Sequence, residues 1–488
     1  MSIVYVDCIV STNSGDTPAD VSVPEIRLLS ATGMLGTGFP EESLRRGLEL
    51  DPHLIGCDAG STDAGPTDLA TGRCRYPAEA YRRDLRLLLP AALGAGIPLI
   101  IGSAGGAGGD ANVDWARRIL QEVAHELRLG FRLAVIYSGQ DKADLKKRLG
   151  EGRIIPLPNS PAVDEASIDE STTIVGVMGT EPIVAALRAG VDVVLAGRAT
   201  DPSIFAALPL LRGARPGPVW HAAKILECGA AAVEHRTTPD CLFAALRGDE
   251  IVVQAPNPAL RCTPTSVAAH SLYENADPFR IVEPSGTLDT THARYEAVDD
   301  RVVRITGSRF VPADPYTVKL ESVRLAGHQT VVVAGVRDPV ILENLDDFLE
   351  SCREGIEARV ARTYRDLPRA SWSVRFRVYG RDGVLGHAEP LREALPHEVG
   401  LIIEITAAEQ EVANNIAATA RHQTLHQPMP GWHGFLGNIA LPYGANDLVR
   451  GPVYEFNMNA VVVPDTPEEL FRTVIVDLPE TGSVGAGV

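Results

Sequence analysis

Short apolar runs alternate with longer amphipathic segments through residues 26–208, and this alternation limits the chain to few folds. The apolar runs Leu54–Cys57, Pro98–Ile101 and Leu133–Tyr137 are nearly uninterrupted, as strands are when a parallel sheet buries both of their faces. Between them, Pro77–Leu93 repeats apolar residues with helical spacing. Strands that alternate with helices imply right-handed βαβ units. The pattern therefore predicts an α/β fold with a mainly parallel sheet flanked by helices.

The same pattern places further elements along the chain. In the first half we expect strands at Ile26–Leu29, Thr173–Val177 and Val191–Leu195, and helices at Pro40–Leu48, Val113–Leu127, Pro182–Ala189 and Pro202–Leu208. After about residue 240 the strand-like segments lengthen and turn signals become more frequent. In this second part we expect strands at Trp372–Tyr379, Val399–Thr406 and Val453–Val462, and a helix at Ala407–Thr424. This order indicates a small α+β unit.

The length of the chain requires more than one folding unit. A chain of 488 residues exceeds what one ordinary core supports. We expect a large α/β domain at residues 1–365, a small α+β domain at 366–480, and a flexible tail rich in Gly, Ser and Val at 481–488. The segment 245–365 either extends the first domain as a mixed region or bridges the two domains.

Charge and cysteine content exclude several classes of protein. The formal net charge is −18 and no basic run occurs, which argues against nucleic acid as a partner. A small anionic substrate stays compatible, because a local Arg outweighs a distant net charge inside a cleft. The seven cysteines are scattered without a CxxC pair, which favours reduced thiols and a cytoplasmic location. We expect neither a signal peptide nor contact with a membrane.

A dense polar loop follows the strand at Leu54–Cys57. Asp58 and Asp63 are candidate catalytic acid/base groups or cation ligands, and Ser61 and Thr62 are candidate substrate ligands. The carboxyl ends of strands in an open parallel sheet are where ligands bind. The alternative is a helix-capping turn, since Asp, Ser and Thr favour caps. A cap needs only one such residue, so we favour the functional interpretation and place the centre of the active site here.

A glycine-rich loop at Gly102–Asp110 follows the next strand. Dense glycines let the backbone approach a ligand and direct amides at an anion, so Ser103, Gly105 and Gly106 are candidate substrate ligands. The spacing matches neither the dinucleotide-binding fingerprint nor a phosphate-binding Walker loop. The alternative is a close-packed turn between a strand and a helix.

Two further loops, Gly179–Pro182 and Ala199–Pro202, both combine a Thr, an acid and a Pro at a helix start. Helix-capping chemistry explains most of that pattern. Arg198 is different, because an Arg at the end of a strand can bind a carboxylate or phosphate through two hydrogen bonds. We therefore predict Arg198, Thr200 and Asp201 as substrate-binding residues. A structural ion pair between Arg198 and Asp201 is the alternative.

Other candidates carry weaker signals. Cys262 could act as a nucleophile only with a base beside it, and most such cysteines are small buried residues. His270 titrates near neutrality in principle, although packing within a helix explains it as well. His422 and His426 share a helix face at i, i+4, a spacing that can bind metal, but no third ligand is evident.

Several segments resemble one known family. Gly56–Pro66 is similar to a signature of the acyclic terpene utilisation AtuA-like family. Similar blocks follow in the same order over almost the whole chain, at Gly102–Gly105, Ala196–Pro202, Ser266–His270, Gly307–Phe310, Gly335–Pro339 and Tyr454–Asn457. The resemblance implies a large α/β domain followed by a small ferredoxin-like domain. It also implies a role in degrading branched acyclic terpenoids and related acids, with hydratase or lyase chemistry. The N-terminal segment departs from the better-known members, so the substrate need not be a terpenoid.

These observations lead to three functional hypotheses. The first is a lyase of the hydratase type that acts on a branched or unsaturated carboxylate or an acyl-CoA-like substrate. The second is a non-catalytic subunit that binds an acyl-CoA or a nucleotide for a partner enzyme. The third is a divalent-metal-dependent hydrolase or isomerase built on Asp58, Asp63 and Asp201. No motif identifies a cofactor or settles whether a metal is used. We expect a homo-oligomer or a complex with a partner subunit.

Overall fold

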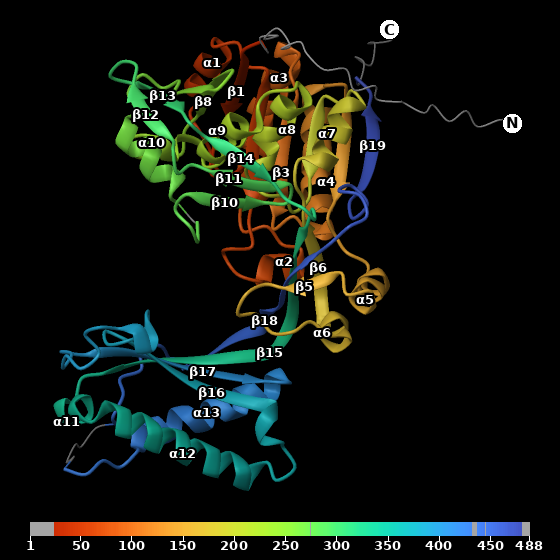
Figure 1. Ribbon diagram of the computed structural model, residues 1–488. Helices are drawn as coiled ribbons and strands as arrows, with labels where there is room; N and C mark the ends of the chain where they lie inside the picture. Colours follow the sequence, from red (N-terminus) through yellow and green to blue (C-terminus); the bar gives the residue numbers. More distant parts are fainter. Residues whose placement is uncertain (1–23, 274, 432–436, 445, 481–488) are drawn as a thin grey trace, which may run out of the picture.

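A computed structural model describes residues 24–480, apart from 274, 432–436 and 445. Figure 1 shows a large body, formed mostly by the N-terminal half of the chain, and a smaller lobe next to it. Two long strands run from one to the other. The predicted tail at 481–488 lies outside the described residues, as does the divergent segment at 1–23.

The large body is built on a ten-stranded sheet, in the order β12-β13-β9-β8-β1-β2-β3-β7-β4-β19. Five adjacent strands at its centre are parallel, as the apolar runs predict. They are β1 (Ile26–Ser30), β2 (Leu54–Gly60), β3 (Leu99–Gly106), β7 (Val193–Ala196) and β4 (Phe131–Tyr137). Their alternate residues enter two different cores. Leu54 packs on one face of the sheet and Ile55 on the other, so both faces require apolar residues.

The prediction of a mainly parallel sheet is wrong, because the other five strands are antiparallel to their neighbours and the sheet is mixed. These strands are β8 (Leu242–Arg247), β9 (Glu250–Gln254), β13 (Val302–Thr306), β12 (Arg294–Ala297) and β19 (Arg472–Leu478). The physical reason for the first pair is local. Gly248 and Asp249 form a two-residue turn with Gly248 at φ +61°, which reverses the chain directly from β8 into β9.

Helices cover both faces of this sheet (Figure 1). One face packs against α1 (Glu41–Leu48), α3 (Ala78–Ala95) and α4 (Asp110–Leu127). The other packs against α7 (Glu181–Arg188), α8 (Ser203–Leu211) and α9 (Pro216–Leu226). Trp220 and Phe205 are among the largest fully buried side chains of the second core. Each such side chain contributes roughly 1.5–3 kcal/mol when removed from water.

A second sheet, entirely antiparallel, joins the body to the small lobe. Its path is β16-β17-β15-β18-β5, and β6 also pairs with β15. The strands are β16 (Trp372–Tyr379), β17 (Val399–Ala407), β15 (Val318–Val336), β18 (Asp447–Val462), β5 (Ile154–Pro156) and β6 (Ser171–Val177). The strand expected at Thr173–Val177 is therefore present, but it pairs antiparallel with β15 and not within the large sheet.

The small lobe has its own core. On one face of β15, β16 and β17 pack α11 (Pro339–Glu343), α12 (Leu345–Thr363) and α13 (Gln410–His426). Its elements follow the order β-α-α-β-β-α-β, with β15 in the centre of the sheet. That order supports the predicted ferredoxin-like character, which stays a prediction. The predicted boundary at residue 366 also stays a prediction. The core of the small lobe includes buried residues on both sides of residue 366, from Val332 to Val360 and from Trp372 to Ile439.

Smaller elements complete the body. They are α2 (Thr67–Thr71), α5 (Lys142–Gly150), α6 (Glu165–Glu170), α10 (Pro264–Ser271), β10 (Arg280–Glu283), β11 (Gly286–Asp289) and β14 (Arg309–Pro312). The strands β10, β11 and β14 form a separate antiparallel sheet beside α9. No helix in the described part of the chain is long and apolar enough to cross a membrane.

Candidate active site

Asp58 lies at the carboxyl end of β2 and is 3 % exposed. Its Oδ2 accepts a hydrogen bond from the Gly60 amide at 3.1 Å, whereas no described residue hydrogen-bonds to the buried Oδ1. The strand is irregular here, because the register with β3 shifts between Asp58 and Gly60. Gly60 has φ +153°, and a Cβ at this position would lie 2.0 Å from the Gly106 carbonyl oxygen. Only glycine allows this close approach of the two strands.

Burial raises the pKa of Asp58 well above its ordinary value, and the negative charge of Asp201 raises it further against the effect of Arg198. Burial therefore favours the protonated form of the Asp58 carboxyl group. A protonated acid whose Oδ1 has no hydrogen-bond partner among the described residues is a candidate proton donor.

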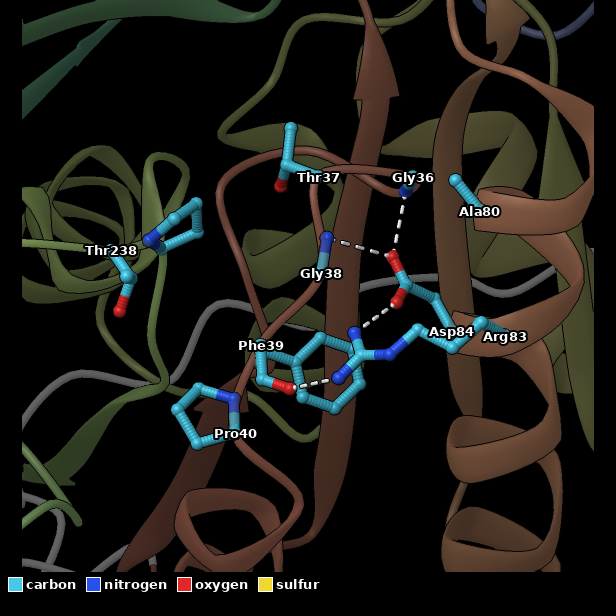
Figure 2. A pocket seen from close by; sticks show the side chains of 10 residues that line it. Gly36, Thr37, Gly38, Phe39, Pro40, Ala80, Arg83, Asp84 and Thr238 are labelled. Atoms are coloured by element: carbon cyan, nitrogen blue, oxygen red, sulfur yellow. Dashed lines mark hydrogen bonds and ion pairs between the residues drawn. The ribbon is translucent and has the colours of Figure 1, made fainter.

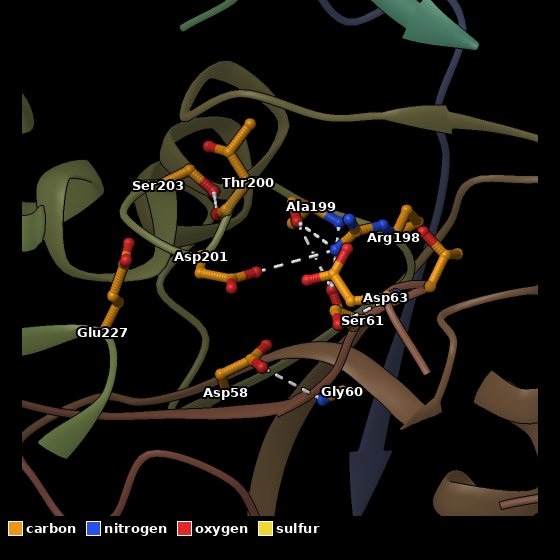
Figure 3. A network of polar contacts seen from close by, with 12 residues as sticks. Asp58, Gly60, Ser61, Asp63, Arg198, Ala199, Thr200, Asp201, Ser203 and Glu227 are labelled. Atoms are coloured by element: carbon orange, nitrogen blue, oxygen red, sulfur yellow. Dashed lines mark hydrogen bonds and ion pairs between the residues drawn. The ribbon is translucent and has the colours of Figure 1, made fainter. Parts of the chain in front are cut away.

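Arg198 follows β7 and is also buried. Its Nε donates to Glu321 Oε2 at 2.9 Å, and its Nη1 donates to Ser103 Oγ at 3.2 Å. Nη1 also lies 3.6 Å from Asp201 Oδ1. Figure 3 shows the carboxyl groups of Asp58 and Asp201 grouped on one side of this guanidinium. The structural ion pair that was the alternative for Arg198 is thus present, together with a stronger one to Glu321.

Glu321 holds Arg198 from the second sheet. It lies on β15, and its Oε2 accepts a hydrogen bond from Thr62 Oγ1 at 3.0 Å, while Lys319 Nζ lies 3.0 Å from Oε1. Burial alone would raise the pKa of Glu321, but Arg198 and Lys319 lower it to about 2. The carboxylate therefore stays charged, and it fixes the guanidinium between the two sheets.

A buried ion pair lies at the C-terminal end of α9. Lys224 Nζ lies 2.5 Å from Glu227 Oε1, and both side chains are less than a tenth exposed. Burial raises the pKa of Glu227 to about 8, with Lys224 lowering it and Asp201 raising it. Figure 3 shows Glu227 on the same side of Arg198 as Asp58 and Asp201.

A third group borders this cluster from β10. Burial raises the pKa of Glu283 to about 8, against the lowering effects of Thr200 and Lys224. Beside it, the Tyr316 hydroxyl donates to Glu181 Oε2 at 2.8 Å. We use "acid cluster" for Asp58, Asp201, Glu227 and Glu283 with their cations Arg198 and Lys224. The cluster combines acids of raised pKa, a carboxylate in an ion pair with Arg198 and a buried ammonium group, which is a set suited to proton transfer.

The loop before α1 borders the site and is anchored from α3. The fully buried Asp84 accepts hydrogen bonds from the Gly36 amide at 2.7 Å and the Gly38 amide at 3.2 Å (Figure 2). Arg83 donates to Asp84 and to the Phe39 carbonyl. The anchored loop then reaches Asp58, whose carbonyl accepts a hydrogen bond from the Leu35 amide at 2.8 Å.

The predicted residues divide into two groups. The structure brings Asp58, Ser103, Arg198, Thr200 and Asp201 together, and Thr62 reaches them through Glu321. In contrast, Asp63 is exposed, and its amide donates to Ser61 Oγ at 3.2 Å. Figure 3 shows Asp63 and Ser61 in the same network as Arg198, but among the described residues no hydrogen bond or ion pair joins the Asp63 side chain to the acid cluster. The catalytic role of Asp63 stays a prediction, as does substrate binding by Ser61.

The glycine-rich loop packs closely against neighbouring backbone. The Gly105 amide donates to the Tyr81 hydroxyl at 3.2 Å, and Gly106 is buried beside Gly60. A Cβ on Gly108 would lie 2.3 Å from the Arg198 backbone nitrogen. These contacts match the alternative of a close-packed turn. Anion binding by the amides of Gly105 and Gly106 stays a prediction.

The weaker candidates lie elsewhere. Cys262 is buried, and burial raises the pKa of its thiol to about 12, which disfavours the nucleophilic thiolate. The rings of His422 and His426 are 4.8 Å apart on α13, and His422 Nδ1 lies 3.0 Å from Arg359 Nη1. Among the described residues, no group of three or more His, Cys, Asp or Glu side chains is placed to hold a metal ion.

Sequence reasoning missed Lys224, Glu227, Glu283 and Glu321. The sequence held a signal for the first two. Lys224 lies within a helix that is otherwise mostly apolar, and Glu227 follows that helix directly. In the structure, residues 217–226 of this helix are all buried. A charged pair in such a helix needs a buried partner. Glu321 gave no local signal, since its partner lies 123 residues away.

Comparison with known proteins agrees with the resemblance noted in the sequence. A family model described as acyclic terpene utilisation family protein AtuA matches residues 64–233 and 244–447. The match contains Arg198, Asp201, Glu227 and Glu321, while Asp58 lies just before it. Searches of curated proteins and of solved structures gave no significant match. Because the family model matches well over half of the chain, the protein belongs to the acyclic terpene utilisation family AtuA.

Proposed function

We propose that the chain is a catabolic lyase of the hydratase type, which adds water to, or removes it from, a branched or unsaturated acid or its acyl-CoA-like thioester. Membership of a family for acyclic terpene utilisation supports a catabolic role. The observation that carries the proposal is Asp58, a buried acid with a raised pKa that lies beside the Asp201 carboxylate and whose Oδ1 has no hydrogen-bond partner among the described residues.

Hydration of a double bond needs two proton movements. A base takes a proton from the attacking water, and an acid delivers one to the neighbouring carbon. We assign delivery of the proton to Asp58 and activation of water to Asp201, which Arg198 holds in an ion pair. Glu227 and Glu283, with pKa values near 8, can then return protons between the cluster and bulk water. Dehydration uses the same groups in reverse.

Arg198 has a changed role in this proposal. Its guanidinium already contacts Glu321, Ser103 and Asp201, so we assign it to positioning and not to holding a substrate anion. Lys224 supplies a second buried positive charge near the acids. A developing negative charge on the substrate carbonyl would be stabilised by such a preorganised cation.

The test is turnover of a panel of branched unsaturated acids and their coenzyme A thioesters in water enriched in ¹⁸O. Mass spectrometry detects incorporation of the label into a hydroxylated product. Asp58→Asn should lower the rate by about 10²–10⁴-fold, because it removes the transferable proton. Asp300→Asn, at an exposed turn, is the matched control and should keep the wild-type rate. Wild-type turnover by Asp58→Asn, or no product from any substrate, would contradict the proposal.

A further inference from the structure

A cavity of about 680 Å³ lies against the acid cluster. Its wall is formed by the anchored loop at 32–37, by Tyr76, by the segment after α9 and by α10. Two of its lining residues are direct neighbours of the site. Cys228 follows Glu227 in the chain, and Met34 precedes Leu35, whose amide donates to the Asp58 carbonyl. The cavity and the acid cluster therefore share a wall.

His270 is the buried polar group of this cavity. Its imidazole is 6 % exposed, and its Nε2 has no hydrogen-bond partner among the described residues. The pKa of His270 is lowered to about 4, mainly by burial and also by the positive charges of Lys224 and Arg236, while a backbone hydrogen bond at Lys224 opposes this shift. The ring is therefore neutral, and the nitrogen left without a partner is an acceptor. A ligand that completes this site must bring a hydrogen-bond donor.

Arg236 gives the cavity a positive charge. Its side chain is exposed, and it forms no ion pair with any residue that the structure describes. The nearby Glu234 does not neutralise Arg236, because Glu234 Oε2 already accepts a hydrogen bond from Arg261 Nε at 2.5 Å. An anionic group at the mouth of the cavity would therefore meet an available guanidinium.

The remaining lining is mostly apolar. It includes Met34, Ala231, Val233 and Ala269, together with the aromatic rings of Tyr76 and Tyr273. The Tyr273 ring stacks on His270, with ring centroids 6.0 Å apart. A ligand for this cavity thus needs three properties, namely an apolar body, a hydrogen-bond donor within it and an anionic end.

We propose that this cavity binds the pantetheine arm of a coenzyme A thioester, with an amide N–H donating to His270 Nε2 and the phosphates close to Arg236. The apolar wall contacts the methyl and methylene groups of the arm. A free branched acid lacks the donor that His270 requires. The orientation, with the thioester toward Asp58, rests on the proposed function, whereas binding of the arm itself does not.

The test is calorimetric binding of free coenzyme A and of pantetheine to the full chain. Both compounds lack the reacting acyl group, so the measurement needs no turnover. We expect both to bind the wild-type chain. His270→Ala should weaken both by about tenfold or more, because it removes the acceptor. Arg236→Gln should weaken coenzyme A by a similar factor but leave pantetheine unchanged, since pantetheine carries no phosphate.

Arg280→Gln, an exposed arginine outside the cavity, is the matched control and should bind both compounds as the wild type does. Thermal unfolding of each variant checks that it is folded. We expect Arg236→Gln to unfold at the wild-type temperature, because the Arg236 side chain is exposed. Failure of coenzyme A to bind, or equal binding by Arg236→Gln and Arg280→Gln, would overturn the inference. If the protein hydrates a free acid but does not bind coenzyme A, the proposed function is supported and the binding inference is rejected. If it binds coenzyme A but turns over no substrate, the binding inference is supported and the proposed function is rejected.

Discussion

At the scale of single residues, the candidate site gathers carboxyl groups whose protonated form is favoured by burial. Asp58, Glu227 and Glu283 all have raised pKa values, with burial as the largest cause in each case. The two buried cations, Arg198 and Lys224, are too few to neutralise this many acids together with Glu321. Proton uptake is the remaining way to lower the cost of burying them.

Glu283 gives a prediction about pH. The folded chain keeps its proton up to about pH 8, whereas the unfolded chain loses it near the ordinary value of 4.5. The folded state thus binds the extra proton between these values, and the stability contributed by Glu283 falls as pH rises through that window. Glu283→Gln should remove this loss. With each pH unit in the window, the free energy of unfolding of the variant should therefore rise relative to that of the wild type by up to about 1.4 kcal/mol.

Urea unfolding at several pH values within that window measures the effect. Glu354→Gln, on the exposed side of α12, is the control and should follow the wild-type pH dependence. If Glu283→Gln keeps the same slope as the wild type, Glu283 is ionised in the folded chain and the argument fails.

Glu321 gives a prediction about stability. Glu321→Gln leaves the buried Arg198 guanidinium without its main carboxylate partner, which should lower the free energy of unfolding by about 3–5 kcal/mol. The matched control is Glu350→Gln, which removes the partner of the more exposed Arg353 and should cost below about 1 kcal/mol. Equal losses in urea unfolding for the two variants would show that the buried pair adds nothing.

Single residues also mark the limit of sequence-based prediction for the site. Asp58, Arg198 and Asp201 could be predicted, because each lies in a loop directly after a predicted strand and such loops meet at one edge of the sheet. Glu283 and Glu321 could not, since they come from β10 and β15, whose packing against the main sheet leaves no local pattern.

At the scale of elements, glycine fixes how closely the strand ends approach. Gly108 has φ +69°, and a Cβ there would meet the Arg198 backbone. Gly213 has a similar φ of +77°, with no atom within 4 Å of its Cβ position. Gly213→Ala should cost only the left-handed backbone penalty of about 1–2 kcal/mol. Gly108→Ala should cost roughly 1–3 kcal/mol more, because the backbone of Arg198 must also shift. Equal losses in urea unfolding would contradict the close packing.

The elements also show why the strand positions could be predicted while the sheet order could not. The five central strands are read from apolar runs whose alternate residues feed two cores, as with Leu54 and Ile55. Strand direction depends on the connection. A two-residue turn at Gly248 reverses β8 into β9, and β6 leaves the main sheet to pair with β15. Pairing over such distances is decided by tertiary packing, which a single sequence does not display.

At the scale of the whole molecule, β15 belongs to two cores. Its first half contributes Val318 and Leu320 to the large body, and its second half contributes Val332 and Val336 to the small lobe. One unbroken strand therefore carries hydrogen bonds of both parts (Figure 1). We therefore expect that destabilising the small lobe also destabilises the large body, because one strand contributes to both cores.

Ile403→Ala tests this coupling. Ile403 is fully buried in the small lobe, and the cavity left by its removal should cost about 2–5 kcal/mol. Hydrogen exchange followed by mass spectrometry should then show faster exchange in both halves of β15, at 318–324 as well as at 330–336. Ile402→Ala, which changes the neighbouring and less buried residue, should have a smaller effect. Faster exchange confined to 330–336 would mean that the two parts open separately.

Because β19 pairs with β4, the large sheet cannot be completed until residues 472–478 have been synthesised. A ribosome delivers the chain from its N-terminus, so β4 at residues 131–137 emerges long before β19 at 472–478. The small lobe is synthesised in the interval between them. Until β19 arrives, β4 presents a bare strand edge to other newly made chains, and such edges recruit foreign strands. The nascent protein thus passes through a period of exposure in which a chaperone bound at β4 would protect it.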